Sequence, residues 1–493
     1  SCSGCTDENA INYDENALLD DGSCEYENVD NILEVPLEFS SIQAAIQVAQ
    51  NGNEILVYDG SYYENINLLG KAIKLYSQSG PENTFIIGDS TISVITCDSN
   101  ESTETIIEGF TISGGYGIGV SFEDFVSNAA NPELFEDMIV NQMMAGGISC
   151  INSSPHLKNL IITNNSSRNV AGGIGLVNSN ALLDNIIVEN NNIMDGDALG
   201  GGGIALNGGN VIINNSIIRN NYVGSNLYQV NGGGGILCGF TFDDLMSMSL
   251  NHVIINNNIA NIGAGIGVLS GELIIDRCVI YNNIGEFGST LTLGEPLGLV
   301  INDIDATIIN STLVDNQGSI SIGMIDSSEL KMVNSILWNE NSLQIANLPN
   351  NNLLNTEISY SAIYNNWDGI NNISENPSFD ENSYLLSSNS TYIDSGIEYM
   401  SFSDGFEVSI APEEYNGESP DIGAYEYEIS NEYTIGDYNQ DGIIDILDII
   451  GLVSGLVNYT LTEEDIQNSD LNQDGYINIL DVVLLMNVIL DSE

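Results

Sequence analysis

Short aliphatic stretches alternate with asparagine-rich turns along most of this chain. Segments such as NLIITNN (159–165), NIIVENN (185–191) and HVIINNN (252–258) place an aliphatic residue two positions before an asparagine. The asparagines form a column: Asn164, Asn190, Asn220, Asn257, Asn282, Asn316, Asn339 and Asn365. The aliphatic residues form another: Ile162, Val188, Ile218, Ile255, Ile280, Val314, Leu337 and Ile363. Because side chains that alternate with a period of two share one face of a strand, each repeat predicts a β-strand with one buried face.

A second pattern, GGI or GAGI followed by two further residues, recurs between the asparagine motifs. It predicts two inward columns: Ile148, Ile174, Ile204, Ile236 and Ile266, and Cys150, Leu176, Leu206, Cys238 and Val268. Like residues that stack at this period predict a parallel β-solenoid of ten or more rungs, in which stacked amides bond along the axis. Cys150 and Cys238 would then lie about 14 Å apart, too far for a disulfide.

The position before each inward aliphatic residue is also apolar and is expected to face outward. This apolar stripe comprises Ile161, Ile187, Ile217, Ile254, Val279, Leu313, Ile336 and Ala362. Soluble proteins rarely leave so long an apolar surface in contact with water. We therefore expect a partner chain, the insertion at 116–145 or a second layer of the same chain to cover it.

The two ends of the repeats indicate one architecture. SSIQAAIQVAQNG (40–52) places apolar residues on one helical face after serine N-cap candidates, which predicts a short helix that closes the first rung. Residues 36–427 resemble the right-handed parallel β-helix of the pectate-lyase-like superfamily, notably in IIEGFTISGG (106–115) and SPDIGAYEY (419–427). The resemblance implies a mainly β fold. It implies no single activity, because this fold carries lyases, hydrolases, esterases, adhesins and structural proteins.

Near the end of the chain, DYNQDGIIDILD (437–448) and DLNQDGYINILD (470–481) have the oxygen spacing of EF-hand calcium loops. Each loop leads into an apolar stretch, and Asp stands at the twelfth position where EF-hands carry Glu. The expected ligands of two Ca²⁺ ions are Asp437, Asn439, Asp441, the Ile443 carbonyl, Asp445 and Asp448, and Asp470, Asn472, Asp474, the Tyr476 carbonyl, Asn478 and Asp481. The duplicated loop resembles a type I dockerin, which predicts a small α-helical calcium module.

The predicted docking positions depart from the dockerin family. Dockerins of this type usually carry Ser or Thr at loop positions 10 and 11, where the cohesin binds. This chain has Ile446–Leu447 and Ile479–Leu480 there. The module is therefore expected either to bind a cohesin-like scaffold in an unusual way or to pack on its own chain or on a neighbouring copy.

At the other end, GCTDENAINYDENALLDDGSC (4–24) resembles a Cys-bounded repeat of secreted proteins from marine bacteria. A Cys5–Cys24 disulfide is expected because both residues bound a short segment with little core of its own. Cys2 is left over. Asp14, Asn16, Asp20 and Asp21 could hold a further Ca²⁺ or form an acidic solvated loop.

Composition narrows the possible partners. The 493 residues carry a formal net charge of −62, with 69 acidic and 7 basic side chains. This balance excludes nucleic acid and anionic membrane surfaces as partners, and it favours bound cations. No apolar run is long enough for a transmembrane helix, and we expect Ser1 to be the processed N-terminus of a secreted protein. We expect three domains, at 1–30, 31–430 and 431–493.

Candidate chemistry is sparse. Glu189 and Arg219 fall in one outward column on neighbouring rungs, and Asp276–Arg277 is a second candidate. If these groups were catalytic, loops 166–171, 192–201 and 222–232 would form a cleft around Glu189 and Arg219. No carboxylate pair suited to hydrolysis stands out, so the sequence favours a non-enzymatic role.

We interpret the chain as a secreted, calcium-stabilised protein that self-assembles with other copies into an extracellular fibre or surface layer. The alternative is a cell-surface or dockerin-anchored β-helix that binds or degrades polysaccharide.

Overall fold

The chain divides into two compact units, Ser1–Tyr427 and Glu428–Glu493. The computed structural model describes residues 3–6, 13, 17, 19–20, 23, 31–119, 127, 144–194, 196, 198–224, 231–239, 246–294, 304–325, 328–348, 355–380, 383–427, 436, 438–439, 444, 446–458, 461, 469–472 and 476–491.

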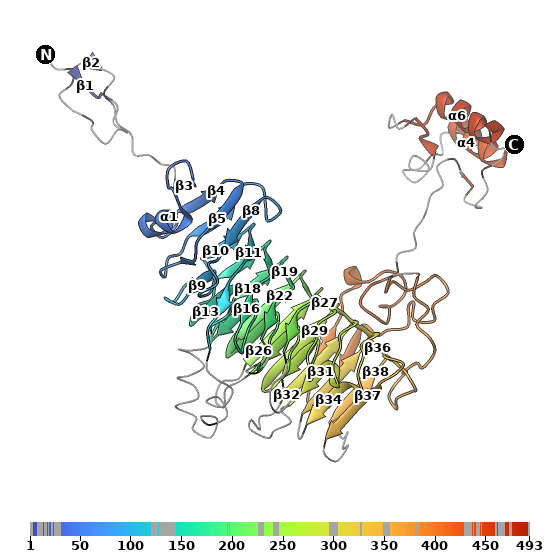
Figure 1. Cartoon of the computed structure of the whole chain (residues 1–493). Helices are drawn as coiled ribbons and strands as arrows, with labels where there is room; N and C mark the ends of the chain where they lie inside the picture. Colours follow the sequence, from blue (N-terminus) through green and yellow to red (C-terminus); the bar gives the residue numbers. More distant parts are fainter. Residues whose placement is uncertain are drawn as a thin grey trace. The chain divides into compact units, whose positions relative to one another are not determined.

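The first unit is a right-handed parallel β-helix whose strands stack rung on rung (Figure 1). Its longest sheet has 12 parallel strands. In spatial order they are β3 (Ile32–Val35), β4 (Glu54–Val57), β7 (Lys74–Ser77), β10 (Ile106–Glu108), β14 (His156–Lys158), β18 (Leu182–Asp184), β22 (Gly209–Asn214), β26 (Met246–Asn251), β29 (Gly271–Asp276), β32 (Ile304–Ile309), β35 (Glu329–Val333) and β38 (Thr356–Ser359).

An 11-stranded parallel sheet follows the 12-stranded sheet within each rung. Its strands are β5 (Gly60–Tyr63), β8 (Thr84–Ile87), β11 (Thr111–Ser113), β15 (Ile161–Thr163), β19 (Ile187–Glu189), β23 (Ile217–Arg219), β27 (Ile254–Asn256), β30 (Val279–Tyr281), β33 (Thr312–Val314), β36 (Ile336–Trp338) and β39 (Ala362–Ile363).

Two further parallel sheets complete the rungs. The 10-stranded sheet contains β6 (Ile66–Asn67), β9 (Ile95–Cys97), β13 (Ile148–Ile151), β17 (Ile174–Val177), β21 (Ile204–Asn207), β25 (Ile236–Cys238), β28 (Ile266–Val268), β31 (Phe287–Leu293), β34 (Ile320–Ile325) and β37 (Leu343–Leu348). The 4-stranded sheet contains β12 (Tyr116–Gly117), β16 (Ser166–Ser167), β20 (Asn192–Ile193) and β24 (Tyr222–Val223). The predicted mainly β solenoid is therefore confirmed.

The predicted inward columns form the core. Ile148, Ile174 and Ile204 pair in register, and the column continues through Ile236 to Ile266. Cys150 and Cys238 lie in the next inward column, and both are buried free thiols. One aliphatic assignment is wrong: Leu313, not Val314, pairs with Ile280 and continues the inward column.

The predicted amide ladder exists, but most of it lies one residue further along the chain. Its members are Asn165, Asn191, Asn221, Asn258, Asn283, Asn316 and Asn339. Asn191, for example, donates from its backbone N and from Nδ2 to Asn221 Oδ1, at 3.0 and 3.2 Å. The predicted column therefore mixes two positions: Asn316 and Asn339 belong to the ladder, whereas Asn164, Asn190, Asn220, Asn257 and Asn282 are turn residues with φ of 54–56°.

The first rung is closed as predicted by α1 (Ile42–Val48), which packs on β3, β4 and β6. Ser41 is its N-cap, and its Oγ accepts a hydrogen bond from Ala44 N at 3.2 Å. Ile42, Ala45 and Ile46 are buried. The helix thus covers apolar side chains of the first rung that would otherwise meet water.

The end of the first unit covers part of the apolar stripe. Leu386, Tyr392 and Ile422 pack on Ile336 and Ala362, which are fully buried. At the other end of the stripe, Ile161, Ile187, Ile217 and Ile254 are half-buried. Leu313 faces inward, and Thr312 takes its place in the outward column. A second layer of the same chain is therefore the cover that the structure shows, and most of 116–145 lies outside the described residues.

Other elements are small. β1 (Ser3–Gly4) and β2 (Leu19–Asp20) pair in parallel, β40 (Tyr399–Ser401) and β41 (Glu407–Ser409) pair antiparallel, and η1 is Pro412–Glu414. Cys5 is buried. Because Cys2, Cys24, Asp14, Asn16 and Asp21 lie outside the described residues, the Cys5–Cys24 disulfide and a calcium site near Asp20 stay predictions.

The second unit contains α4 (Ile446–Asn458) and α6 (Ile479–Asp491). The two helices pack through Leu452, Val482 and Leu485. Among the described residues, no helix is long and apolar enough to span a membrane.

Candidate functional site

Glu189 and Arg219 lie in register on β19 and β23, as predicted. Arg219 Nε donates to Glu189 Oε2 at 2.7 Å. The Arg219 side chain is 40% exposed, so the pair is a surface ion pair on two neighbouring rungs. Both side chains point outward as predicted, but each charge is already paired with the other.

Asp276 and Arg277 form a larger cluster than the sequence indicated. Arg277 Nη1 donates to Asp276 Oδ2 and Nη2 donates to Glu414 Oε1, each at 2.9 Å. Burial raises the pKa of Asp276, although Arg277 opposes the shift. Because Glu414 lies 137 positions away in sequence, no local pattern could identify it. The cluster attaches the closing segment of the first unit to the solenoid.

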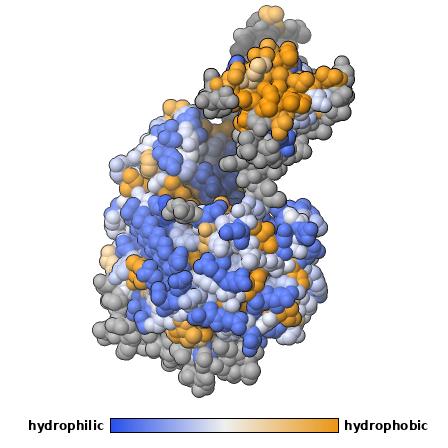
Figure 2. Space-filling view, turned by 90° about the vertical axis from the view of Figure 1, so that its right-hand side faces the viewer, coloured by the Kyte–Doolittle hydropathy of each residue, from blue (hydrophilic) through white to orange (hydrophobic). Residues whose placement is uncertain are grey.

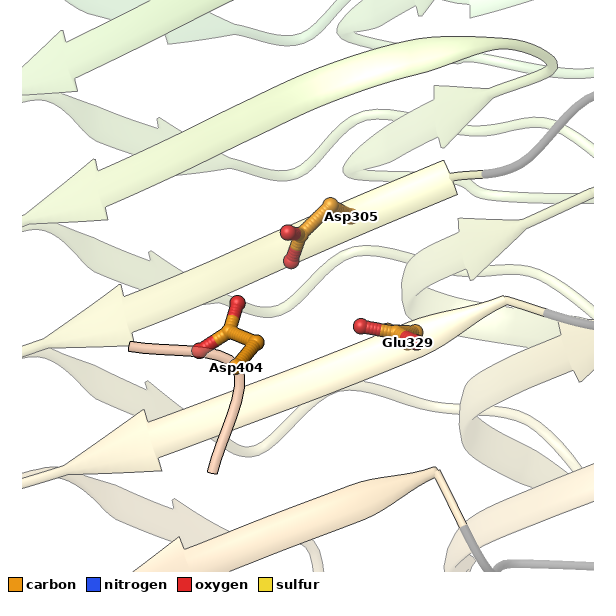
Figure 3. Close-up of side chains that lie close together, drawn as sticks. All are labelled: Asp305, Glu329 and Asp404. Carbon is orange, nitrogen blue, oxygen red and sulfur yellow. The ribbon is translucent and has the colours of Figure 1, made fainter. Parts of the chain in front are cut away.

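A buried lysine lies among three carboxylates on the 12-stranded sheet. Asp305 extends from β32, Glu329 from β35 and Asp404 from the loop between β40 and β41 (Figure 3). Lys331 Nζ donates to Asp305 Oδ1 at 2.6 Å and lies 2.8 Å from Asp404 Oδ2. Burial disfavours the ammonium, but the hydrogen bonds to Asp305 and Asp404 outweigh burial and raise the pKa of Lys331. Lys331 therefore remains a cation and is a poor general base.

Asp421 and Glu426 form a carboxylate pair that the sequence reading missed. Asp421 Oδ1 accepts a hydrogen bond from Asp394 N at 2.7 Å, and Glu426 Oε1 accepts one from Asp421 N at 3.1 Å. Burial, followed by the neighbouring Asp421 charge, raises the pKa of Glu426 to about 7. These oxygens accept hydrogen bonds from backbone N–H groups near the end of the first unit. The pair therefore stabilises the fold of that segment.

A groove among the described residues lies on the rung of Arg219 and the rungs that follow it, and neither Glu189 nor Arg219 lines it. The groove has a volume of ≈ 470 Å³, within the usual range for ligand sites of roughly 300–1,000 Å³. Its lining residues are Tyr222, Val223, Asn231, Ile259, Ala260, Asn261, Ile284, Gly285, Glu286, Gln317 and Gly318. Among the described residues of the three predicted loops, those that line the groove belong to 222–232.

The two calcium-like loops of the second unit are built alike. Asp448 lies in the first turn of α4 and Asp481 in the first turn of α6, and both side chains are fully buried. Asn439 N donates to Asp448 Oδ1 at 3.1 Å, and Asn472 N donates to Asp481 Oδ1 at 3.3 Å. The residue at loop position 3 thus contacts the carboxylate at position 12 in both loops.

The second loop shows more of its expected ligand set. Asn478 N donates to Asp481 Oδ2 at 2.9 Å, and Asn478 Nδ2 donates to the Tyr476 carbonyl at 3.3 Å. A buried carboxylate in a loop that also carries amide and carbonyl oxygens suits a hard cation such as Ca²⁺. Five expected ligands lie outside the described residues: Asp437, Asp441, Ile443, Asp445 and Asp474.

Comparison with known proteins identifies this unit. Residues 435–490 match the family model of the dockerin type I domain. The second unit is a dockerin domain. No curated protein matches the chain.

Solved structures resemble the solenoid at low identity. Pectate lyase Pel9A shares 15% identity, with a TM-score of 0.46, over 79% of this chain and 91% of that chain. A mutant of pectin methylesterase, in complex with a hexasaccharide, shares 12% identity, with a TM-score of 0.25, over 59% of this chain and 77% of that one. Likeness at this level carries no information about activity.

The dockerin domain exposes apolar side chains where its helices begin. Ile446 and Leu447 are 58% and 53% exposed, and their counterparts Ile479 and Leu480 are 67% and 58% exposed. Figure 2 shows hydrophobic side chains gathered on one face of the domain. Dockerin domains generally bind calcium, and the buried position-12 carboxylates fit that property.

Proposed function

We propose that this chain is an extracellular or cell-surface β-helix protein that is anchored by its dockerin domain and binds polysaccharide. The single observation that carries the proposal is the dockerin type I domain at 435–490 in one chain with a long parallel β-helix. Dockerin-bearing proteins are typically extracellular or attached to the cell surface. The solenoid then offers a long, rigid surface on which a polymer can lie.

The anchoring partner is a cohesin-like domain, because type I dockerins bind cohesins. The exposed pairs Ile446–Leu447 and Ile479–Leu480 are the apolar anchors of that interface. Such anchors contribute most when a matching apolar pocket desolvates them. A cohesin that binds this chain therefore has an apolar docking surface in place of one that binds the hydroxyl groups of Ser or Thr.

Two Ca²⁺ ions would hold the dockerin loops through the ligands that the loop spacing predicts. The carboxylates repel one another in the absence of a cation, and Ca²⁺ prefers this set of carboxylate, amide and carbonyl oxygens. Within the described residues, the inward carboxylates of Asp448 and Asp481 support this assignment.

The basic residues support binding rather than lyase chemistry, in which a lysine or arginine must abstract a proton. Arg219, Arg277 and Lys331 are held by carboxylates. Lys74 and Lys158 both bind Glu108, Lys71 Nζ donates to backbone carbonyls of α1, and Arg168 Nη1 donates to the Gly119 carbonyl at 3.5 Å. Every one of the 7 basic side chains thus has a partner.

Self-assembly into a fibre is not supported. That interpretation depended on an exposed apolar stripe, and residues such as Leu386, Tyr392 and Ile422 of the same chain cover part of it. The spare Cys2 lies outside the described residues and adds no support.

Two binding assays test the proposal with the full-length chain, one against cohesins and one against polysaccharides. Titration against a panel of purified cohesins in calcium should give a complex that chelation abolishes. The double variant Leu447→Asp/Leu480→Asp should weaken the complex by at least about 100-fold, since loss of two central apolar anchors costs roughly 3 kcal/mol. Leu37→Asp, at an exposed leucine of the solenoid, is the matched control and should bind normally. Absence of binding to every cohesin and every polysaccharide tested would contradict the proposal.

A further inference from the structure

The groove has an apolar floor that follows the solenoid axis. Tyr222, Ile259 and Ile284 bridge from one rung to the next, and their side chains are 40–44% exposed. Because rungs are spaced by about 4.8 Å, the three side chains extend over about 10 Å. Val223 and Ala260 lie beside them and are buried. This floor offers flat apolar contacts to a ligand that lies along the axis.

Polar groups surround this floor. Asn231 is buried, and its Nδ2 donates to the Val223 carbonyl at 3.2 Å. Its Oδ1 accepts no hydrogen bond from the described residues, although buried amide oxygens are nearly always paired. Because this oxygen is itself enclosed by protein, Asn231 forms part of the wall of the groove and does not contact a ligand directly. Asn261, Gln317 and Glu286 supply further donors and acceptors.

The charge of the groove selects among ligands. Glu286 is the one carboxylate among its described lining residues, and Ser319 Oγ donates to Glu286 Oε1 at 2.5 Å. Of the same lining residues, none is basic. The chain as a whole carries a formal net charge of −62. A polyanion would therefore meet repulsion here, both from Glu286 and from the long-range field of the protein.

We propose that this groove is a binding subsite for an uncharged polysaccharide, whose sugar rings carry hydroxyl groups but no carboxylate or sulfate. The apolar faces of the rings pack on Tyr222, Ile259 and Ile284, and ring hydroxyls bond to the exposed Gln317 and Glu286. The inference rests on the proposed function and names the class of glycan that the solenoid binds.

The test uses the full-length chain in calcium and isothermal titration calorimetry. The ligands are soluble neutral polysaccharides (glucan, mannan, xylan and galactan) and the polyuronate polygalacturonate. At least one neutral polymer should bind, and polygalacturonate should not. Tyr222→Ala should weaken neutral binding about tenfold, since an aromatic side chain supplies the largest apolar contact of the floor.

Two further variants make the test specific. Tyr63→Ala changes an exposed tyrosine outside the groove and should leave affinity unchanged. Glu286→Lys should raise the affinity for polygalacturonate relative to the unaltered chain, because it removes the nearest repulsive charge and adds an attractive one. Melting curves of all variants should coincide, since each changed side chain is exposed.

The possible failures are distinguishable. If polygalacturonate alone binds, or if neutral binding does not respond to Tyr222→Ala, the subsite is wrong while polysaccharide binding stands. If no polysaccharide binds to the full-length chain, both the subsite and the polysaccharide-binding function are wrong. If the chain still binds a cohesin in that case, the anchoring function alone is supported.

Discussion

The β-helix and the dockerin domain both bury closely spaced polar side chains, but with different chemistry. In the β-helix, Asn191 and Asn221 belong to a ladder in which each amide donates to the next. In the dockerin domain, Asp448 and Asp481 are buried carboxylates that accept backbone N–H groups. An amide carries donors and an acceptor, so a stack of amides satisfies itself. A carboxylate only accepts, so a loop of carboxylates needs a cation.

This difference shows which groups stabilise each unit. The β-helix depends on groups that the chain itself supplies on every rung. The dockerin domain has a small apolar core around Leu452, Val482 and Leu485, and a domain this small usually needs a metal or a comparable constraint. We therefore expect calcium to control the dockerin domain and to leave the β-helix almost unchanged.

The largest effect is expected from removal of calcium. Excess chelator should unfold the dockerin domain, because each empty loop contains repelling carboxylates. Each site contributes roughly 2.7 kcal/mol when calcium is a hundredfold above its Kd. Scanning calorimetry should show loss of one transition, while the β-helix transition keeps its midpoint.

The matched variants are Asp448→Asn and Asp481→Asn in calcium. Each keeps the size of the side chain but removes the charge that holds the ion, so each should reproduce the effect of chelation for its own loop. A chelator-induced fall in the β-helix midpoint would contradict the independence of the two units.

A smaller effect is expected from one rung of the amide ladder. Asn221→Ala removes the oxygen that accepts from both Asn191 N and Asn191 Nδ2. It should destabilise the β-helix by about 3 kcal/mol, because two buried donors lose their acceptor. Denaturant melts of the β-helix transition measure this loss.

The neighbouring Asn220 provides the control. It is a turn residue with φ of 56°, and glycine adopts this conformation without steric cost. Asn220→Gly should therefore change stability by about 0.5 kcal/mol or less. Equal losses for the two variants would show that the ladder is not the source of stability.

The sequence was sufficient for the fold because stacked rungs repeat their residues. The GGI columns and the capping helix required only periodicity and an N-cap. The ladder was misplaced because most turns contain two consecutive asparagines, and sequence alone does not show which one is buried. One rung departs from this pattern because its turn is Asp315–Asn316. The predicted inward residue of that rung, Val314, therefore lies one position after Leu313, which is the residue that faces inward.

The sites were less predictable because their partners come from distant segments. Asp404 reaches Lys331 from a loop after the last rung, and Glu414 reaches Arg277 in the same way. The groove contains an isoleucine pair, Ile259 and Ile284, that no motif distinguishes from the core. In contrast, the dockerin loops are contiguous in sequence, so their spacing was enough to recognise them.

The smallest expected effect is the pH dependence of the β-helix. Glu426 has a pKa of about 7 in the folded chain against an ordinary value of 4.5. The folded state thus keeps a proton that the unfolded state has lost between these pH values. Stability should fall as pH rises from about 4.5 through about 7. Glu426→Gln should flatten this part of the melting profile, and an unchanged slope would contradict the role of Glu426.

The central claim is that one unit anchors the chain by means of calcium while the other holds a polysaccharide without it. The most direct measurement is retention of a labelled cohesin on an insoluble neutral polysaccharide by the full-length chain. In calcium, the cohesin should be retained only when the chain is present. Addition of chelator should release the cohesin and leave the chain on the polymer. Release of both together, or no retention in calcium, would contradict the account.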